Sequence, residues 1–490
     1  MDFNLKRDFI AAYPAKLCAA LGAVMLKHQV VMYVAGGSVR DWLLGVEPRD
    51  LDLTVSRDAF GCAKSLALDL GGTFVGLDEK EDVGRVVWRD LVMDFSSFRN
   101  DTTSIVADLK LRDFTINSMA VALDPLSGSL ARPRTLIDPV GGLADLENKV
   151  IRVFSGQAFI DDPLRLVRAF RFVAGLDFTI ASETMAAIVE HALRLPQVAM
   201  ERVCYEMQLI MRAGRSHAAI AAMADVGLLG VIFPELLKGK SLEQPASHHL
   251  DVFDHNLEAL RCLEQVLAAP ERYFVQNRDL FTLYLQHEKK KSWLKWAALF
   301  HDVGKPATCR IRDERITFYN HDHAGGAIFE VIARRLHFSK EDRLQVVRFI
   351  ALHMWPFHLS NARVKTGISK KACLRLVKAV RDELPGLFLL AMADGLAGQG
   401  PDKPEMIEEN LAQLFYEVNQ VYQEHIKPVL TNPPLLTGHD LQNEFLLTPG
   451  PLFKEILDGL QNAQVEHGVG DREQAVCWVR QFLAEKGGAK

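Results

Sequence analysis

The chain has 490 residues, 49% of them hydrophobic and 24% charged, a balance that predicts several globular domains and excludes disorder and disulfide-dependent miniproteins. Its 57 Lys and Arg residues against 62 Asp and Glu give a net charge of −5, which argues against a protein that coats nucleic acid without specificity. No apolar run approaches the roughly 18 residues of a membrane helix, and the N-terminus does not read as a signal peptide. With seven scattered cysteines, the sequence predicts a cytoplasmic protein with no membrane partner.

Short β-branched runs alternate with helical patterns over residues 31–125, after a helix expected within residues 1–30. Strands are expected over VMYVAGG, DLDLTV, GRVVWRD, LVMDFSSF and MAVAL, and helices over VRDWLLG and AFGCAKSLALDLGG. From about Gly141 onward, apolar residues recur with a helical period, which predicts a mostly helical remainder. Proline-rich breaks at Pro234–Pro245 and Pro428–Pro434 predict domain boundaries.

The most informative stretch is YVAGGSVRDWLLGVEPRDLDLTV. A strand that ends at Gly36-Gly37 and leads into a helix lets the backbone approach an anion, with Ser38 and Arg40 as additional donors. Asp50 and Asp52 lie two apart on the next strand, so both carboxylates face one side. A Gly-Gly turn alone is usually only a turn, and a lone D-x-D is usually surface. Together, they predict Mg²⁺ ions that bridge to a triphosphate.

A second pattern, DDPLR, places Asp162 and Arg165 three residues apart, as neighbours on one helix face. A carboxylate accepts a hydrogen bond from an exocyclic amine, and a guanidinium donates one to a ring nitrogen. Cytosine and adenine both offer this donor-acceptor edge, whereas uracil and guanine offer the reverse. The pair could therefore admit C and A and reject U and G. The same spacing also suits an ordinary salt bridge on a solvated helix.

These stretches resemble the motifs of the class II tRNA nucleotidyltransferase and bacterial poly(A) polymerase family. GGSVRDWLLG…RDLDLTV is similar to its active-site signature, LRDFTINSMAV (111–121) to its RRDFTINA segment, and DPVGGLADLENKVIR (138–152) to its turn-and-helix. DDPLRLVRAFRFVAG (161–175) is similar to its nucleotide-selecting segment and ERVCYEM (201–207) to its neck helix. LLTGHDLQNEFLLTPGPLFKEIL (435–457) is similar to the tail of longer members.

The resemblance implies roles for individual residues. Asp50 and Asp52 would bind Mg²⁺ and activate the 3′-OH, while the triphosphate- and base-binding set would comprise Gly36, Gly37, Ser38, Arg40, Arg112, Asp162, Arg165 and Arg168. Asp94 lies where polymerase-β-like folds often place a third carboxylate. Leu111 and Asp161 depart from the family's usual arginine and glutamate. The segment between MDFSSFR and DLKLRDF is short, as in a subgroup that includes enzymes adding only CC or only A.

A third pattern lies in the helical half, where histidines and aspartates follow the order of the HD phosphohydrolase domain. They are His255, His301, Asp302, His321, His353 and Asp394. Mixed nitrogen and oxygen ligands suit a divalent transition metal, whose bound water could attack a phosphoester. Any one of these histidines could instead be an ordinary core residue. The resemblance implies phosphatase or 2′,3′-cyclic phosphodiesterase activity in some relatives.

Residues 361–381 carry seven basic residues and no acid, although the chain as a whole is acidic. Such a track attracts RNA phosphates, but it also fits a solvated helix face. The RNA contacts that we expect are Arg363, Lys370, Lys371, Arg375 and Lys378.

The resemblance thus predicts an α+β protein: a polymerase-β-like nucleotidyltransferase head with a mixed sheet (1–140), then a helical neck that binds nucleotide and RNA (141–235), an HD domain (236–400) and a helical tail (401–490). The expected activity is template-independent addition of C, A or both to the tRNA 3′ end from CTP and ATP. Poly(A) polymerase, an HD phosphohydrolase with an RNA-binding N-terminal half and a non-enzymatic RNA-binding protein remain alternatives. The oligomeric state stays open.

Overall fold

The computed structural model describes residues 13–46, 50–130, 135–312 and 315–487. The first twelve residues of the helix expected within 1–30 lie outside this range. The chain divides into two compact units, residues 1–210 with 222–232 and residues 211–221 with 233–490. The division lies beside the boundary predicted at Pro234. The finer division into head, neck, HD domain and tail stays a prediction.

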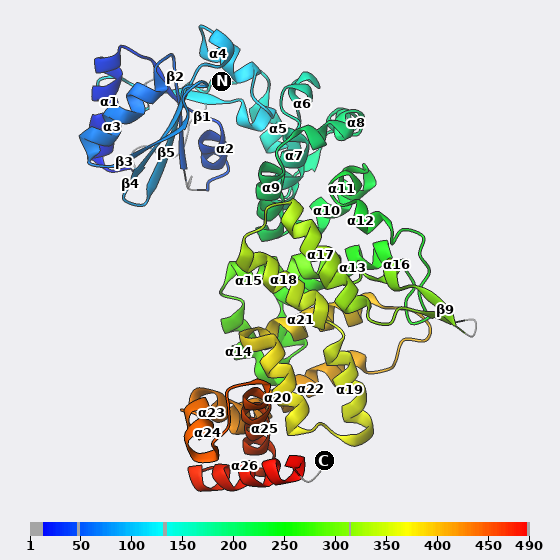
Figure 1. The fold of residues 1–490 in the computed structure, drawn as a ribbon. Helices are drawn as coiled ribbons and strands as arrows, with labels where there is room; N and C mark the ends of the chain where they lie inside the picture. Colours follow the sequence, from blue (N-terminus) through cyan, green and yellow to red (C-terminus); the bar gives the residue numbers. More distant parts are fainter. Residues whose placement is uncertain (1–12, 47–49, 131–134, 313–314, 488–490) are drawn as a thin grey trace. The chain divides into compact units, whose positions relative to one another are not determined.

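A six-stranded sheet organises the first unit (Figure 1). Its strands are β1 (Met32–Ala35), β2 (Asp50–Val55), β3 (Thr73–Asp78), β4 (Val83–Trp88), β5 (Leu91–Ser97) and β6 (Ala120–Ala122), in the order β3-β4-β5-β2-β1-β6. Only β2 and β5 pair in parallel, whereas the other neighbours are antiparallel. The mixed sheet of the prediction is therefore confirmed. Strand β3 was not predicted, because its residues are mostly exposed and lack the alternation that marks a half-buried strand.

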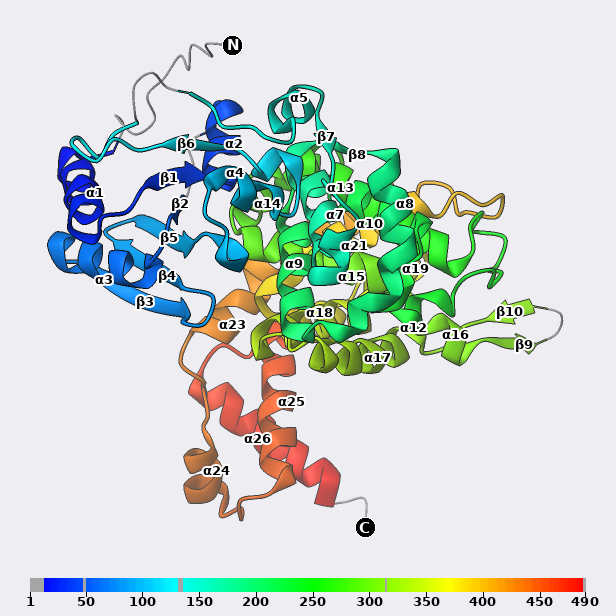
Figure 2. The ribbon, with the colours of Figure 1, turned by 90° about the horizontal axis from the view of Figure 1, so that it is seen from above.

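Helices cover both faces of this sheet (Figures 1 and 2). Helix α3 (Ala59–Leu70) packs on β3, β4 and β5 and is itself covered by α1 (Ala15–His28), while α2 (Gly37–Leu43) packs on β1 and β2 from the other side. The Asp58 carboxylate caps α3 by accepting from the Gly61 N–H at 3.1 Å. On β2, Leu51 and Leu53 are buried, whereas Asp50 is exposed and Asp52 partly exposed, so the carboxylates face away from the leucines.

Helices and short turns complete the first unit. In chain order they are η2 (Arg99–Asp101), α4 (Ile105–Lys110), η3 (Thr115–Asn117), α5 (Gly142–Glu147), α6 (Gln157–Asp161), α7 (Arg165–Leu176), α8 (Ser182–His191), η4 (Ala192–Gln197), α9 (Met200–Arg212), α10 (Ser216–Asp225) and α11 (Leu228–Ile232), the last turn of α9 and the first part of α10 lying in the second unit. A short parallel pair, β7 (Val150–Ile151) with β8 (Thr179–Ile180), lies among them.

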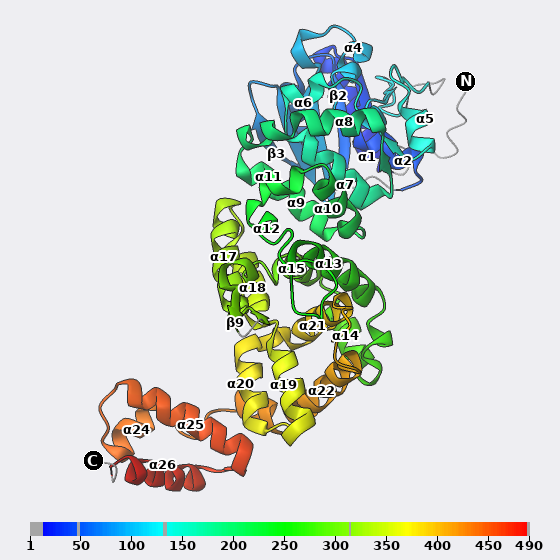
Figure 3. The same cartoon turned by 90° about the vertical axis from the view of Figure 1, so that its right-hand side faces the viewer.

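The second unit is almost entirely helical (Figure 3). Its helices are α12 (Pro234–Leu237), α13 (Val252–Ala268), η5 (Pro270–Arg272), η6 (Val275–Asn277), α14 (Arg278–Tyr284), α15 (Glu288–Phe300), α16 (Lys305–Thr308), α17 (His321–Arg335), α18 (Lys340–Leu352), α19 (Trp355–Thr366), α20 (Lys370–Val380), η7 (Arg381–Glu383), α21 (Leu384–Ala397), α22 (Ile407–Val421), η8 (Tyr422–Ile426), α23 (Lys427–Thr431), α24 (Gly438–Phe445), α25 (Pro451–His467) and α26 (Arg472–Gly487). Strands β9 (Arg310–Arg312) and β10 (Arg315–Thr317) form an antiparallel pair.

The mostly helical remainder predicted from Gly141 onward is confirmed, and it contains two short strand pairs, β7–β8 and β9–β10, that were not predicted. Each strand is only two or three residues long, too short for a period-two pattern to show against helical surroundings.

Helix α13 packs against α15 and α21 at the centre of the second unit, and residues 435–487 bury an apolar cluster of their own between α24, α25 and α26. Among the described residues, none of the helices has both the length and the apolar character needed to cross a bilayer.

Candidate active site

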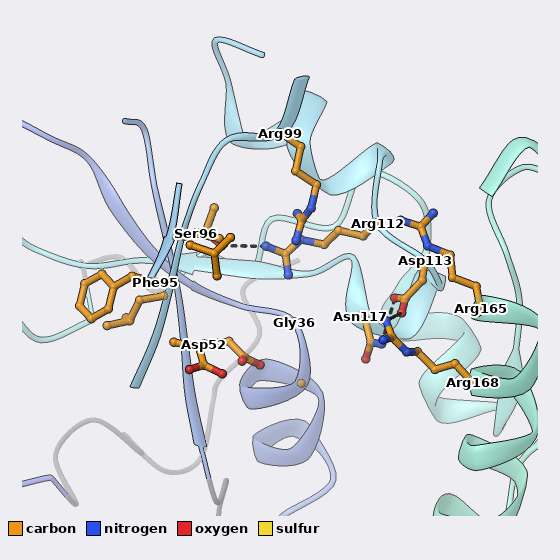
Figure 4. Close-up of a pocket in the computed structure, with 15 residues that line it drawn as sticks. Gly36, Asp52, Phe95, Ser96, Arg99, Arg112, Asp113, Asn117, Arg165 and Arg168 are labelled. Carbon is orange, nitrogen blue, oxygen red and sulfur yellow. Dashed lines mark hydrogen bonds and ion pairs between the residues drawn. The ribbon is translucent and has the colours of Figure 1, made fainter. Parts of the chain in front are cut away.

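A pocket of about 310 Å³ opens in the first unit, between the carboxylate face of β2 and the N-terminal part of α7 (Figure 4). It is lined by Gly36, Gly37, Asp52, Leu53, Thr54, Val83, Asp94, Phe95, Ser96, Arg99, Arg112, Asp113, Asn117, Arg165 and Arg168. Many of the charged and glycine positions predicted from the sequence therefore meet in one cavity.

Two carboxylates lie side by side on the central strands of the sheet. Asp52 on β2 is in register with Asp94 on the parallel strand β5, and both line the pocket. Burial raises the pKa of the Asp52 carboxyl, although the Ser38 N–H and Arg112 act in the opposite direction. Arg85 of β4 holds Asp94 through bonds of 2.6 and 2.7 Å. Asp50, on the same face as Asp52, is exposed and lies outside the pocket lining.

The Gly-Gly turn packs directly against these groups. Gly36 has a φ of +70°, and a Cβ atom there would lie 2.8 Å from Arg112 Nη1 and 3.3 Å from Asp52 Oδ2, so glycine suits this position sterically and conformationally. Ser38 is buried, and its hydroxyl donates to the Asp50 carbonyl at 2.9 Å while accepting from the Asp52 N–H at 2.7 Å. The Ser38 side chain thus links α2 to β2 by hydrogen bonds. The sequence predicts instead that Ser38 binds the triphosphate.

Arg112 enters the pocket from the segment that follows α4. Its guanidinium donates to Thr54 Oγ1 at 2.7 Å and to Asp108 Oδ2 at 3.3 Å. The Asp108 side chain is fully buried and also accepts from Arg99, whose Nη1 lies 3.1 Å from both carboxylate oxygens. One buried carboxylate therefore holds two arginines. Figure 4 shows both arginines, Arg99 and Arg112, in the pocket that Gly36 also lines.

A second charged network joins the pocket to helices α7 and α9. Arg168 donates to Asp113 Oδ2 at 3.0 Å and to Glu206 Oε1 at 3.1 Å, and Arg171 forms an ion pair with Glu206 at 2.7 Å. Burial alone would raise the pKa of Asp113, but Arg168 and Asn117 outweigh it and lower that pKa to about 2. Arg168 is thus held by two carboxylates at the pocket wall.

Arg40, which the sequence assigned to the triphosphate, donates to Asn117 Oδ1 at 2.7 Å and pairs with Asp41. It does not line the pocket.

Asp162 and Arg165 lie on either side of a helix start. The sequence placed them on one helix face, but α6 ends at Asp161 and α7 begins at Arg165, because a residue before proline avoids the helical region and Pro163 follows Asp162. Asp162 instead pairs with Arg202 of α9 at 3.0 Å. Arg165 lines the pocket, and its Nη1 donates to the Ala158 carbonyl at 3.4 Å.

In the second unit, the six His and Asp residues predicted from the sequence come together from several helices. His255 Nε2 lies 3.0 Å from Asp394 Oδ1 and 3.2 Å from His301 Nε2, and His301 Nε2 lies 3.3 Å from Asp302 Oδ2. Asp302 Oδ1 lies 3.2 Å from His321 Nε2, which in turn lies 3.2 Å from His353 Nε2. Two possible metal-binding groups therefore overlap at Asp302.

The donor atoms of this cluster fit a cation. The Nδ1 atoms of His301, His321 and His353 each donate to a backbone carbonyl at 2.7–2.9 Å, so Nδ1 carries a proton and each Nε2 is directed at the cluster, where it can bind a metal ion. Two ring nitrogens 3.2 Å apart require a proton or a metal ion between them. Asp302 Oδ1 is also buried without a hydrogen bond.

Several residues of this centre are not apparent from the sequence pattern. Lys305 Nζ lies 2.5 Å from Asp302 Oδ2 and donates to Gln244 at 2.7 Å. The His248 ring lies 4.7 Å from that of His255, and His248 belongs to a further possible metal-binding group with His255 and Asp394. Burial, with Lys305 nearby, lowers the pKa of His248 to about 3, which keeps its ring neutral. The only sequence signal for His248 is that it lies next to a second histidine, His249.

The basic residues expected to contact RNA differ in their surroundings. Lys371 and Arg375 are exposed one turn apart on α20, and Lys370 at its first position is partly exposed. Arg363 bonds Glu417 at 3.1 Å and Asn410 at 2.9 Å, and Lys378 bonds Asp458 at 3.1 Å. The exposed basic face is therefore shorter than the sequence track.

In the first unit, the sequence interpretation missed Arg99, Asp108, Arg202 and Glu206. Arg202 and Glu206 lie within the recognised segment ERVCYEM, which was the available signal. Arg99 is the last residue of the segment MDFSSFR and begins η2, and its contact with Asp108 arises only from the turn between them.

Comparison with known proteins places the chain in a family. The family model described as the poly A polymerase head domain matches residues 32–152, and the one described as a probable RNA and SrmB-binding site of polymerase A matches residues 177–239. An A-adding tRNA nucleotidyltransferase of Deinococcus radiodurans is 33% identical over 93% of this chain and 96% of its own length. A CC-adding tRNA nucleotidyltransferase of Thermus thermophilus is 30% identical over 90% and 92%.

Solved structures agree on the fold. A CCA-adding enzyme with CTP matches 98% of both chains with a TM-score of 0.64 and 20% identity, and a Thermotoga maritima CCA-adding enzyme complexed with tRNA matches 98% of both with a TM-score of 0.61 and 21% identity. From the match to the head-domain model and the near full-length similarity to curated relatives, the chain belongs to the tRNA nucleotidyltransferase and poly(A) polymerase family.

Proposed function

We propose that this protein adds C, A or both to the 3′ end of tRNA from CTP and ATP, with release of pyrophosphate. The observation that carries the proposal is the pocket that Asp52, Asp94, Arg112 and Arg165 line together. Figure 4 shows Asp52 on one side of it and Arg165 on the other. Such a cavity offers carboxylates on one side and anion- and base-binding groups on the other. The near full-length relatives include one that adds A and one that adds CC, so the identity of the nucleotide added is part of what must be tested.

The carboxylate face would hold Mg²⁺ through Asp50 and Asp52, with Asp94 level with Asp52 on the neighbouring strand. When bound there, the ion would supply activation of the tRNA 3′-OH and neutralisation of the leaving pyrophosphate. The chain's own residues position the substrates. Gly36 lets Arg112 pack closely against the turn, and Asp108 and Thr54 fix Arg112 in that orientation at the pocket, where it would bind the phosphates.

Asp162 and Arg165 would read the base, as a carboxylate acceptor and a guanidinium donor. Arg202 holds the Asp162 carboxylate at 3.0 Å, which limits its orientation. A base with the reversed edge would leave these groups unpaired in the complex, which costs binding energy.

The experiment that tests the transfer reaction uses the full chain with tRNAs that end before CCA, after C and after CC, with CTP and ATP supplied separately and together. The Asp52→Asn variant should lose incorporation on every substrate, because the amide removes the charge that holds the ion. Asp90→Asn, an exposed carboxylate of the same unit, is the matched control and should retain activity. If the Asp52→Asn variant is folded and its nucleotide incorporation is unchanged, the proposal is contradicted. The lengths of the products distinguish addition of CC, addition of A and processive tailing.

A second candidate activity is favoured by the buried His and Asp cluster of the second unit. We propose that His255, His301, Asp302, His321, His353 and Asp394 form an HD-type site that holds divalent transition metal and hydrolyses a phosphoester. Its support is the convergence of the His301 and His321 Nε2 atoms on the buried Asp302 carboxylate, at 3.3 and 3.2 Å.

Metal content of the protein after incubation with Mn²⁺, Co²⁺ or Ni²⁺ and gel filtration should fall in the Asp302→Ala variant. Equal metal content in the variant and the wild type would contradict this assignment. Asp322→Ala serves as the control, since Asp322 is a neighbouring buried carboxylate outside the candidate metal-binding groups.

A further inference from the structure

We propose that Arg99 binds the phosphate chain of the incoming nucleotide, next to Arg112. This inference rests on the proposed function, because it adds a residue to the same nucleotide site.

The position of Arg99 is fixed by contacts that leave its guanidinium at the pocket. Its backbone N–H donates to Asp108 Oδ1 at 3.0 Å, and its Nη1 donates to both Asp108 oxygens at 3.1 Å. Its side chain nevertheless remains 37% exposed and lines the cavity with Gly36, Asp52 and Arg112. Figure 4 shows the Arg99 side chain extending from its turn toward Arg112.

Two arginines share one buried carboxylate at this wall of the pocket. Asp108 carries one negative charge and pairs with both Arg99 and Arg112, which together carry two positive charges. Asp52 also attracts Arg112, but in the proposed function its charge is offset by Mg²⁺. Burial lowers the pKa of Arg112, and the proximity of Arg99 adds to that effect, so the two guanidiniums lie close enough to repel. A polyphosphate between them and the Gly36 turn would neutralise the surplus charge and accept the remaining N–H donors.

The nucleotide is a better occupant than the RNA backbone because of the neighbours of Arg99. Arg112 Nη1 packs against Gly36, since a Cβ atom there would lie 2.8 Å from it. Both residues line the same cavity as Arg99 and Asp52, so an anion in that cavity would lie beside the carboxylate. The RNA 3′ end must reach the carboxylates as well, so its terminal phosphate is the competing source of the same chemistry, and the experiment separates the two.

The test compares Arg99→Gln and Arg99→Lys with wild type in the full chain, with Arg57→Gln as a control that removes an exposed positive charge from the same unit. Tripolyphosphate binding is measured by calorimetry with Mg²⁺ present, and KM for CTP, ATP and tRNA is measured separately. Arg99→Gln should weaken tripolyphosphate binding and raise the nucleotide KM by about tenfold or more, because a charge-assisted hydrogen bond is lost. Arg99→Lys should recover part of this affinity, and Arg57→Gln should match the wild type.

Two results would overturn the inference. One is an Arg99→Gln variant whose tripolyphosphate affinity stays within about twofold of wild type, whatever happens to its thermal stability. The other is a rise confined to the KM for tRNA, which would assign Arg99 to the acceptor strand. Because tripolyphosphate binding requires no turnover, a wild-type protein that adds no nucleotide would contradict the proposed function and leave the Arg99 measurement valid.

Discussion

Replacement of Glu206 by Gln tests the charged network that holds helix α7 against the pocket. Glu206 is 3% exposed, bonds Arg168 at 3.1 Å and pairs with Arg171 at 2.7 Å. Gln keeps the shape but removes the charge, and its amide N–H₂ would face a guanidinium donor. Removing one partner of a fully buried ion pair costs about 3–5 kcal/mol.

The expected cost for Glu206→Gln is smaller, because Arg168 and Arg171 stay 29% and 30% exposed and water can solvate part of each cation. Arg168 also retains Asp113 at 3.0 Å. We therefore expect a loss of about 2–3 kcal/mol, which lowers the melting temperature of a unit of this size by about 4–12 °C.

Scanning calorimetry of the full chain measures this shift, with Glu190→Gln as an exposed control on α8. If no transition of Glu206→Gln moved by more than about 1 °C, the charge of Glu206 would contribute nothing to the first unit and the reasoning would be refuted.

Two further predictions concern substrate binding. In Asp162→Asn, an amide that can donate replaces a carboxylate that only accepts hydrogen bonds. The preference for CTP and ATP over UTP and GTP should therefore fall by about tenfold or more in single-nucleotide incorporation assays. An unchanged preference would show that Asp162 does not read the base. Lys371→Ala combined with Arg375→Ala removes the exposed cations of α20, so tRNA affinity should fall and the slope of log affinity against log salt should decrease by about two. Lys454→Ala, an exposed cation of α25, is the control, and an unaltered salt slope in the double variant would place the RNA elsewhere.

The sequence predicts well those site residues that lie in one short motif, and it predicts poorly those contacts that depend on the conformation of a turn. The strand period places Asp50 and Asp52 on one face, and the resemblance of LRDFTINSMAV to a family motif implied the role of Arg112. The structure places Gly36, Asp52 and Arg112 around one pocket. Arg99 was missed because its link to Asp108 depends on a turn that contains Asn100 at a φ of +50°. Such a backbone conformation leaves little trace in hydrophobic periodicity.

Prolines and long-range contacts account for the other differences. Pro163 separates Asp162 from the helix that carries Arg165, so a spacing of three did not mean a shared face. His248 joins the His and Asp cluster from the loop before α13, and nothing in its local sequence fixes that contact. The six clustered residues themselves were found because their order along the chain, rather than their spacing, was informative.

Because β2 pairs with β5 in parallel, the position of Asp94 beside Asp52 depends on the register of these two strands. Asp52 and Asp94 are level only because the chain returns through α3, β3 and β4 before β5 joins the sheet. A slip of β5 by one residue would turn Asp94 toward the α3 side and leave Asp52 alone. Misregistered molecules could keep most of their hydrogen bonds and remain compact, yet they would lack the paired carboxylates. The specific activity of a preparation would then report the fraction of molecules in the native register, which circular dichroism alone would overestimate.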